Sequence, residues 1–277
     1  MQIKRNCPYK PLSKQPLVLV LAQIRFSPIL SIEEYIPKIQ DFLRKNGYPF
    51  SNQHNLIFET AQNEQGDGTQ IVIKQWRFES SAYDTVITID KEQVVFQTGS
   101  YTKFEDFIES YISIINKVFE ITEHDKYGII VRLGLRYVDH VKKQNDIDNI
   151  DSYLRPELQG LVCAEYIDDR KQYSIASIGK TKPSDDFEGQ LSIRIIRGEK
   201  GLDLPPDLMA SAPYSRKPVA FDEEIAIIDM DHYWMGSIEP KINIIEIVKD
   251  RFFKLHDTII NSFYNSVVTK EGIEKWK

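Results

Sequence analysis

Residues 127–141 read Tyr-Gly-Ile-Ile-Val-Arg-Leu-Gly-Leu-Arg-Tyr-Val-Asp-His-Val, and this pattern predicts one long strand in the middle of the chain. Side chains alternate across a strand, so one face should be apolar and the other should carry two arginines around a glycine. A glycine in a strand leaves room for another group to lie against the backbone. The predicted faces are Ile129, Val131, Leu133, Leu135 and Tyr137 on the core side, and Ile130, Arg132, Gly134, Arg136 and Val138 on the other.

The sequence that precedes this strand predicts a strand, a helix, four strands and a second helix. Residues 17–26 form an aliphatic run of strand length, and each helix is preceded by the form of a capping box, Ser31-Ile-Glu-Glu34 and Thr102-Lys-Phe-Glu105. Both helices have apolar residues at helical spacing. The four strands are expected at 55–61, 69–79, 83–90 and 93–98, and their short links predict an antiparallel meander.

The same order of elements recurs on the C-terminal side. Arg25 and Arg136 stand in similar aliphatic-Arg-aromatic contexts, 136 − 25 = 111 residues apart. We therefore predict an α+β protein of two β-α-β4-α repeats, with curved antiparallel sheets and long packing helices, similar to a helix-grip or TATA-binding-protein-like saddle. The alternative is that strand and helix alternate by chance. The later elements are expected at 148–154 (helix), 161–167, 172–178, 190–197 and 224–231 (strands) and 239–268 (helix).

These elements divide the chain into an N-terminal arm (1–15), a first unit (16–122) and a second unit (123–277). The second unit differs by two irregular stretches, 181–187 and 198–222, which are rich in proline, glycine, serine and aspartate. Long irregular connections inside compact domains are uncommon and often contact partners. The loop 198–222 is therefore either a partner-binding loop or a tolerated surface insertion.

Composition narrows the class of function. A net charge of −6 and a pI near 5.5 over 277 residues argue against broad neutralisation of phosphates, and they fit a small ligand or a partner with a basic surface. The two cysteines, Cys7 and Cys163, have no metal or redox spacing, which is typical of reduced thiols in the cytoplasm. No signal peptide and no membrane-spanning run is recognised. We expect a cytoplasmic protein that does not contact membranes.

Several segments together resemble a family of sporadically distributed bacterial proteins of about this length. The most specific is Arg132-Leu-Gly-Leu-Arg-Tyr137. The resemblance covers nearly the whole chain and implies an association with mobile or defence-associated genes, but no activity, catalytic residue or cofactor. The other segments that carry it are Pro16-Leu-Val-Leu-Val, Gln23-Ile-Arg-Phe26, Trp76-Arg-Phe78, Tyr101 with Phe104, Asp231-His-Tyr233, and His256, Phe263 and Trp276.

Strand arginines are the candidate binding residues. Arg132 and Arg136 share a strand face, Arg25 takes the equivalent face if the repeat is real, and Trp76 and Arg77 are candidate neighbours. Arginine presents planar, bidentate donors that suit carboxylate or phosphate and also stacks on aromatic rings. The structural alternative is that these arginines pair with acidic residues across the sheet or cover apolar surface with their stems.

Catalytic and metal-binding motifs are absent from the sequence. His140, Asp229, Asp231 and His232 are of metal-ligand type, but no HxH, HExxH or cysteine pair accompanies them. No nucleophile motif or phosphate-binding glycine loop is present either. We therefore expect no metal and no cofactor, and an enzyme with a non-contiguous site near His140, Asp231 and His232 is the less favoured alternative.

The sequence as a whole indicates a non-catalytic binding protein. We expect it to contact a protein partner through an open sheet face and the 198–222 loop. The alternative is a saddle centred on the strand arginines that binds a small anionic ligand or nucleic acid, of which nucleic acid fits the charge less well. A homodimer is compatible with the sequence.

Overall fold

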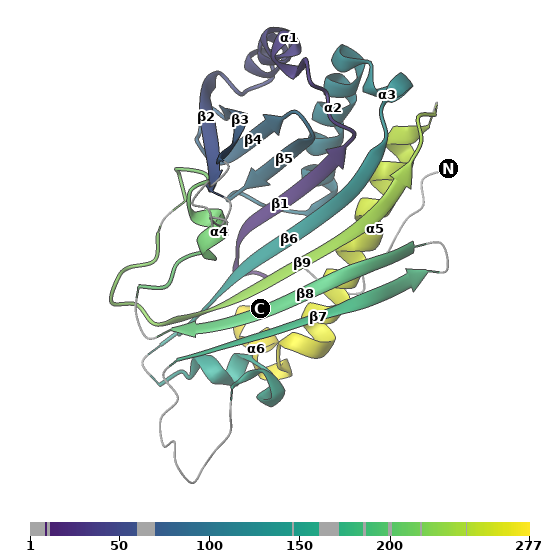
Figure 1. Cartoon of the computed structure of the whole chain (residues 1–277). Helices are drawn as coiled ribbons and strands as arrows, with labels where there is room; N and C mark the ends of the chain where they lie inside the picture. The colour runs from purple at the N-terminus through teal and green to yellow at the C-terminus, as the bar shows by residue number, and fades with distance from the viewer. Residues whose placement is uncertain are drawn as a thin grey trace, which may run out of the picture.

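A computed structural model of the chain describes residues 9, 12–59, 70–145, 147–160, 172–184, 187–198, 201–216, 218–241 and 243–277. These residues form a mixed α+β structure around one large antiparallel sheet (Figure 1). The predicted strand at 161–167 lies outside the described residues.

The elements follow the predicted order in the first unit. The strands are β1 (Leu17–Phe26), β2 (Phe50–Glu59), β3 (Gln70–Glu79), β4 (Thr85–Asp90), β5 (Gln93–Thr98), β6 (Ile130–Lys142), β7 (Tyr173–Ser184), β8 (Phe187–Gly198) and β9 (Ile225–Ile238). The helices are α1 (Ile32–Lys45), α2 (Phe104–Thr122), α3 (His124–Tyr127), α4 (Pro206–Met209), α5 (Ile244–Ser262) and α6 (Lys270–Trp276). Short helical turns are η1 (Ile150–Tyr153), η2 (Pro156–Leu158) and η3 (Phe263–Val267).

The nine described strands form a single sheet in the order β2-β3-β4-β5-β1-β6-β9-β8-β7. β1 and β6 pair antiparallel at its centre, with Leu21 opposite Arg136 and Arg25 opposite Arg132. The two predicted units therefore share one sheet. Short links between β3, β4 and β5 make these strands neighbours, as the meander prediction required.

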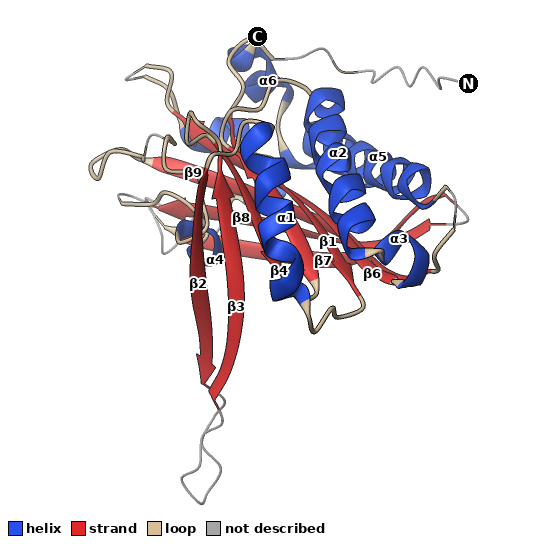
Figure 2. Cartoon of the chain, turned by 90° about the horizontal axis from the view of Figure 1, so that it is seen from above, coloured by secondary structure: helices blue, strands red, loops and turns tan. Residues whose placement is uncertain are grey.

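The helices α1, α2 and α5 lie together on one face of the sheet (Figure 2). The main core fills the space between them and the sheet, because β1, β6 and β9 direct alternate apolar side chains toward the helices. Ala22, Leu135 and Met230 are fully buried there, together with Tyr111 of α2 and Phe252 of α5. We call the opposite face the open face.

The segment between β8 and β9 covers one end of the open face. Leu204, Leu208 and Ala212 are buried in a second, smaller core. Their partners on the sheet are Leu19, Val138, Ile225 and Ile227. The loop predicted at 198–222 is thus a packed part of the fold, and we call its described residues, 201–216 and 218–222, the docked loop.

The predicted alternation of the central strand is wrong at its beginning. Ile130 is fully buried in the main core, whereas Val131 is 38% exposed. Both neighbouring strands shift register here, between Ile130 and Arg132 on the β9 side and between Arg25 and Phe26 on the β1 side. A bulge adds one residue and reverses the faces of those that precede it, so Ile129 and Val131 do not extend the apolar face.

Several predicted boundaries also differ. Neither Ser31 nor Thr102 makes a capping hydrogen bond, and Lys103 is the N-cap of α2. The helix predicted at 239–268 begins only at Ile244 and ends at Ser262. Residues 150–153 form a short 3₁₀ turn instead of a helix. Within the stretch 181–187, the described residues 181–184 and 187 belong to the ends of the paired strands β7 and β8.

None of the helices in the described part of the chain combines the length and the apolar character that a membrane-spanning helix requires.

Candidate functional site

A polar pocket of about 310 Å³ lies on the open face, between the sheet and the docked loop. Its floor comes from β1, β3, β4, β5, β6 and β9, and one side comes from α4 and the residues that follow it. The strands supply polar side chains here because they occupy the positions alternating with the main core. The lining residues on the sheet are Leu21, Gln23, Gln75, Thr88, Gln93, Val95, Gln97, Arg132, Gly134, Arg136 and Asp231; those from the docked loop are Asp207, Leu208 and Ser211.

Arg136 reaches this pocket but is engaged within the protein. Its Nε donates to Oδ1 of Asp229 at 2.7 Å, and its Nη1 donates to Oδ2 of Asp207 at 2.5 Å. Burial by itself would lower the pKa of Arg136, but the two carboxylates outweigh it and raise the pKa above its usual range. Arg136 therefore ties the docked loop to the sheet.

Arg77 is also engaged within the protein, and Trp76 does not lie on the same face of the sheet. Arg77 is buried, and it donates to the backbone oxygens of Ser211 and Ala212 at 2.8 and 3.0 Å and to Glu79 at 2.8 Å. Trp76 points to the opposite face of β3 and belongs to the main core. Consecutive residues of a strand point to opposite faces, so the two could not share one surface.

Arg25 and Arg132 lie opposite each other on β1 and β6, also on the open face. Arg25 is half-exposed and forms an ion pair with Glu92 at 2.8 Å. Arg25 and Arg136 occupy the same face, but Arg25 is half-exposed whereas Arg136 is buried.

Among the described arginines of the open face, Arg132 has the least internal pairing. Its guanidinium lies over the ring of Tyr233, 4.4 Å from the centroid, and its nearest carboxylate oxygen, on Asp231, is 3.9 Å away. Within the described residues no hydrogen bond satisfies the guanidinium. Burial lowers the pKa of Arg132, the carboxylate of Asp231 opposes this, and the charge of Arg25 adds to the lowering. The group remains a cation at neutral pH, since arginine is effectively always protonated.

Gly134 makes room for the side chain of Arg132. A Cβ built on Gly134 would stand 3.3 Å from Nη1 of Arg132, which is tighter than most such contacts. This glycine does leave space against the backbone, as expected, and the protein's own guanidinium, that of Arg132, fills the space. Gly134 lets Arg132 fold down beside Tyr233.

The glutamines of the pocket were not singled out in the sequence. Gln23 donates to Gln93 at 2.6 Å, and Gln93 and Gln75 both donate to Oδ2 of Asp90, at 2.6 and 3.0 Å. Gln97 donates to the backbone oxygen of Ser211. The signal that could have identified them is the placement of an amide at alternate positions of otherwise apolar strands, 23 and 75 among them.

Exposed aromatic side chains on the docked loop and beside it were also missed in the sequence. The rings of Phe50 and Tyr83 stack with their centroids 4.7 Å apart. The backbone N–H of Ser215, in the docked loop, donates to the backbone oxygen of Tyr83 at 2.9 Å. Tyr214 is 69% exposed, above Arg77. We call Phe50, Tyr83 and Tyr214 the aromatic patch.

The residues of metal-ligand type do not converge. Asp229 and Asp231 do share the open face, but His232 points to the main core, where it hydrogen-bonds Thr181 and the backbone oxygen of Leu255. His140 lies on the open face, where its ring bonds to the backbone oxygen of Asp203. Across the residues that the structure describes, no three His, Cys, Asp or Glu side chains are arranged to hold a metal ion.

No family model, no curated protein and no solved structure matches this chain.

Proposed function

We propose that this chain is a non-catalytic binding protein, and that its partner is another protein that contacts the docked loop and the open face of the sheet. In the complex, an acidic side chain of the partner lies against Arg132. The observation that carries this proposal is that Arg132 faces a polar pocket with its charge incompletely paired, while Arg77 and Arg136 are engaged by the docked loop.

The aromatic patch supports a protein as the partner. Phe50, Tyr83 and Tyr214 are 43, 40 and 69% exposed; Tyr214 belongs to the docked loop, and Tyr83 is hydrogen-bonded to it. Aromatic residues and arginine are enriched at the centres of protein interfaces, where large rigid side chains lose little entropy on binding. A net charge of −6 makes nucleic acid a poor alternative, because its binding depends on neutralising many phosphates.

The strand order supports two diverged units, 16–122 and 123–277, as part of this proposal. β1 is followed outward by β5, β4, β3 and β2, and β6 is followed outward by β9, β8 and β7. Each unit would thus contribute its first strand to the centre of a saddle with helices on one face. The open face, which lacks those helices, is the surface that such a saddle presents to its partner.

Photo-crosslinking in cells of the host organism tests the proposal. A benzophenone amino acid at position 214 should give a defined adduct with one protein, because this position lies in the interface. The same group at Tyr127, which is 78% exposed on α3, away from α4 in Figures 1 and 2, is the control. The same adducts from both positions would contradict the proposal.

Affinity measurements with the purified partner complete the test. Arg132→Gln and Tyr214→Ala should each weaken binding by about tenfold or more, as expected for central interface residues. Deletion of 199–219 is unsuitable, because it would uncover the second core and remove the partners of Arg77 and Arg136. Unchanged affinity in both variants would overturn the proposal. Arg132-dependent binding of free glutamate in the absence of any partner would replace the protein by a small anion.

A further inference from the structure

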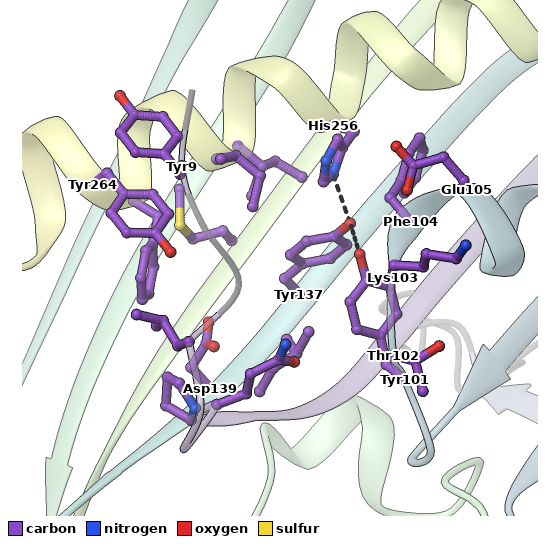
Figure 3. Close-up of a pocket in the computed structure, with 18 residues that line it drawn as sticks. Tyr9, Tyr101, Thr102, Lys103, Phe104, Glu105, Tyr137, Asp139, His256 and Tyr264 are labelled. Carbon is purple, nitrogen blue, oxygen red and sulfur yellow. Dashed lines mark hydrogen bonds between the residues drawn. The ribbon is translucent and has the colours of Figure 1, made fainter. Parts of the chain in front are cut away.

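A second cavity, of about 320 Å³, lies on the other side of the sheet, between β6 and the helices α2 and α5 (Figure 3). Its volume is in the range of small-molecule sites. Exposed Thr102, Lys103 and Glu105 line it at the start of α2, so the cavity reaches solvent there. It is separated from the polar pocket by the thickness of the sheet.

The walls of this cavity are largely aromatic. The rings of Tyr9 and Tyr264 are stacked, with centroids 4.1 Å apart, and Phe104 stacks on His256 at 4.0 Å. The face of an aromatic ring carries partial negative charge and attracts cations, most strongly where water is excluded. The rings that line the cavity are those of Tyr9, Tyr101, Phe104, Tyr137, Phe263 and Tyr264.

The polar groups at one end of the cavity satisfy each other. The hydroxyl of Tyr137 lies 2.7 Å from Nδ1 of His256 and 3.4 Å from the hydroxyl of Tyr101 (Figure 3). Burial lowers the pKa of His256 to about 3, so its ring is neutral and shares one hydrogen bond with the hydroxyl of Tyr137 through Nδ1. This end therefore offers no charge to a ligand.

Asp139 differs from these polar groups, because it lines the cavity without a partner among the described residues. It follows Tyr137 on the same face of β6, its exposed fraction is only 5%, and it lines the cavity. Within the described part of the chain, its carboxyl group forms no hydrogen bond and no ion pair. Burial raises the pKa of Asp139 to about 8, and the charge of Asp229 adds to the effect. A buried carboxyl without a partner is costly, and proteins retain such groups mainly where a ligand or a reaction uses them.

We propose that this cavity binds a small organic cation, an amine with an apolar body, and that the carboxylate of Asp139 is its counter-ion. The aromatic walls supply cation–π contacts and cover the apolar body. Glu105 adds negative charge at the exposed side, while Lys103 is held by Asp106 at 3.1 Å. Apart from Asp139, Glu105, Lys103 and the neutral His256, the titratable side chains that line the cavity are tyrosines, which are uncharged at neutral pH.

Binding has a proton signature. At pH 7 the free protein holds Asp139 protonated, whereas an aliphatic amine arrives as the ammonium ion. To form the ion pair, Asp139 releases its proton to the buffer and the ammonium keeps its own. The complex therefore releases up to about one proton for each amine bound, by linkage between ionisation and binding.

Isothermal titration calorimetry with three ligands of similar shape tests this inference. Phenethylamine should bind at least about tenfold more tightly than 2-phenylethanol, because it gains the ion pair and the cation–π contacts. Phenylacetate should not bind. Titration at pH 7 in phosphate and in Tris should show proton release with the amine. Equal binding of amine and alcohol, or amine binding without proton release, would overturn the inference.

Two variants locate the site. Asp139→Asn keeps the size of the side chain and should abolish both the preference for the amine and the proton release, while 2-phenylethanol binds as before. Arg132→Gln, on the other face of the sheet, should leave amine binding unchanged, so the proposed partner interface and this cavity are tested separately. Circular dichroism shows that each variant is folded. If Asp139→Asn is folded and still prefers the amine, the assignment to this cavity is wrong.

Discussion

Arg136 of β6 and Asp229 of β9 form a buried, two-point ion pair on the open face, with Nε–Oδ1 and Nη2–Oδ2 distances of 2.7 and 3.0 Å. The side chains are 9% and 1% exposed. The same guanidinium binds Asp207, so one residue connects the central strand, its neighbour and the docked loop. This arrangement makes Arg136 part of the fold, and it distinguishes this arginine from Arg132.

Arg136→Met should lower the free energy of unfolding by about 2–4 kcal/mol, because it leaves a buried carboxylate with one fewer partner. The loss stays below the full cost of an isolated charge, since Arg194 also donates to Asp229, at 2.8 Å. Arg25→Met is the control, and the loss of its half-exposed pair with Glu92 should cost less than about 1 kcal/mol. Urea denaturation measures both. Equal losses would show that Arg136 does not connect the sheet to the loop.

Leu208→Ala should destabilise the protein by about 2–4 kcal/mol, because Leu208 is buried in the second core and leaves a cavity there. Its neighbour Met209 is 59% exposed, and Met209→Ala should change stability by less than about 0.5 kcal/mol. Chemical denaturation and limited proteolysis of the docked loop provide the measurements. If the two variants behave alike, the loop is not packed on the sheet in solution.

Asp139 should make the protein less stable as the pH rises. Its folded-state pKa is raised to about 8 from an ordinary value of 3.8, so the unfolded chain ionises first. The contribution of Asp139 to the free energy of unfolding therefore has its full value below pH 4. It falls as the pH rises toward 8 and levels off above that pH. In Asp139→Asn this dependence is removed, so its melting temperature should exceed that of the wild type by more at pH 9 than at pH 5. A difference that does not grow with pH would contradict the raised pKa.

Much of the first unit could be predicted from the sequence. The structure places β1 at 17–26 and β5 at 93–98, as expected, and β3 differs from the expected range by one residue. These strands follow from alternating apolar residues and short polar links, both of which are local. The antiparallel order also follows, because links this short cannot cross a sheet.

Other predictions failed where local pattern was insufficient. The bulge at Val131 reversed the predicted faces because its position depends on both neighbouring strands. The N-terminal serine and threonine of the expected capping boxes make no capping bond, so their spacing alone did not fix a helix start. Trp76 and His232 were grouped with residues that point to the opposite face of the sheet. Each grouping ignored the two-residue period of a strand.

The sequence by itself determined the class of fold, the central strand with its two arginines, and most of the strands, because periodicity and turn chemistry are properties of neighbouring residues. Only the tertiary structure decided what the arginines do. Arg77 meets Ser211 across 134 residues of sequence and Arg136 meets Asp207 across 71. Arg132 lies near Asp231 of β9 at 3.9 Å, but it has no hydrogen-bonded partner among the described residues. The cavity beside Asp139 likewise arises from separate strands and helices. Contacts over such separations depend on how the sheet and the docked loop pack, and no local pattern encodes that packing.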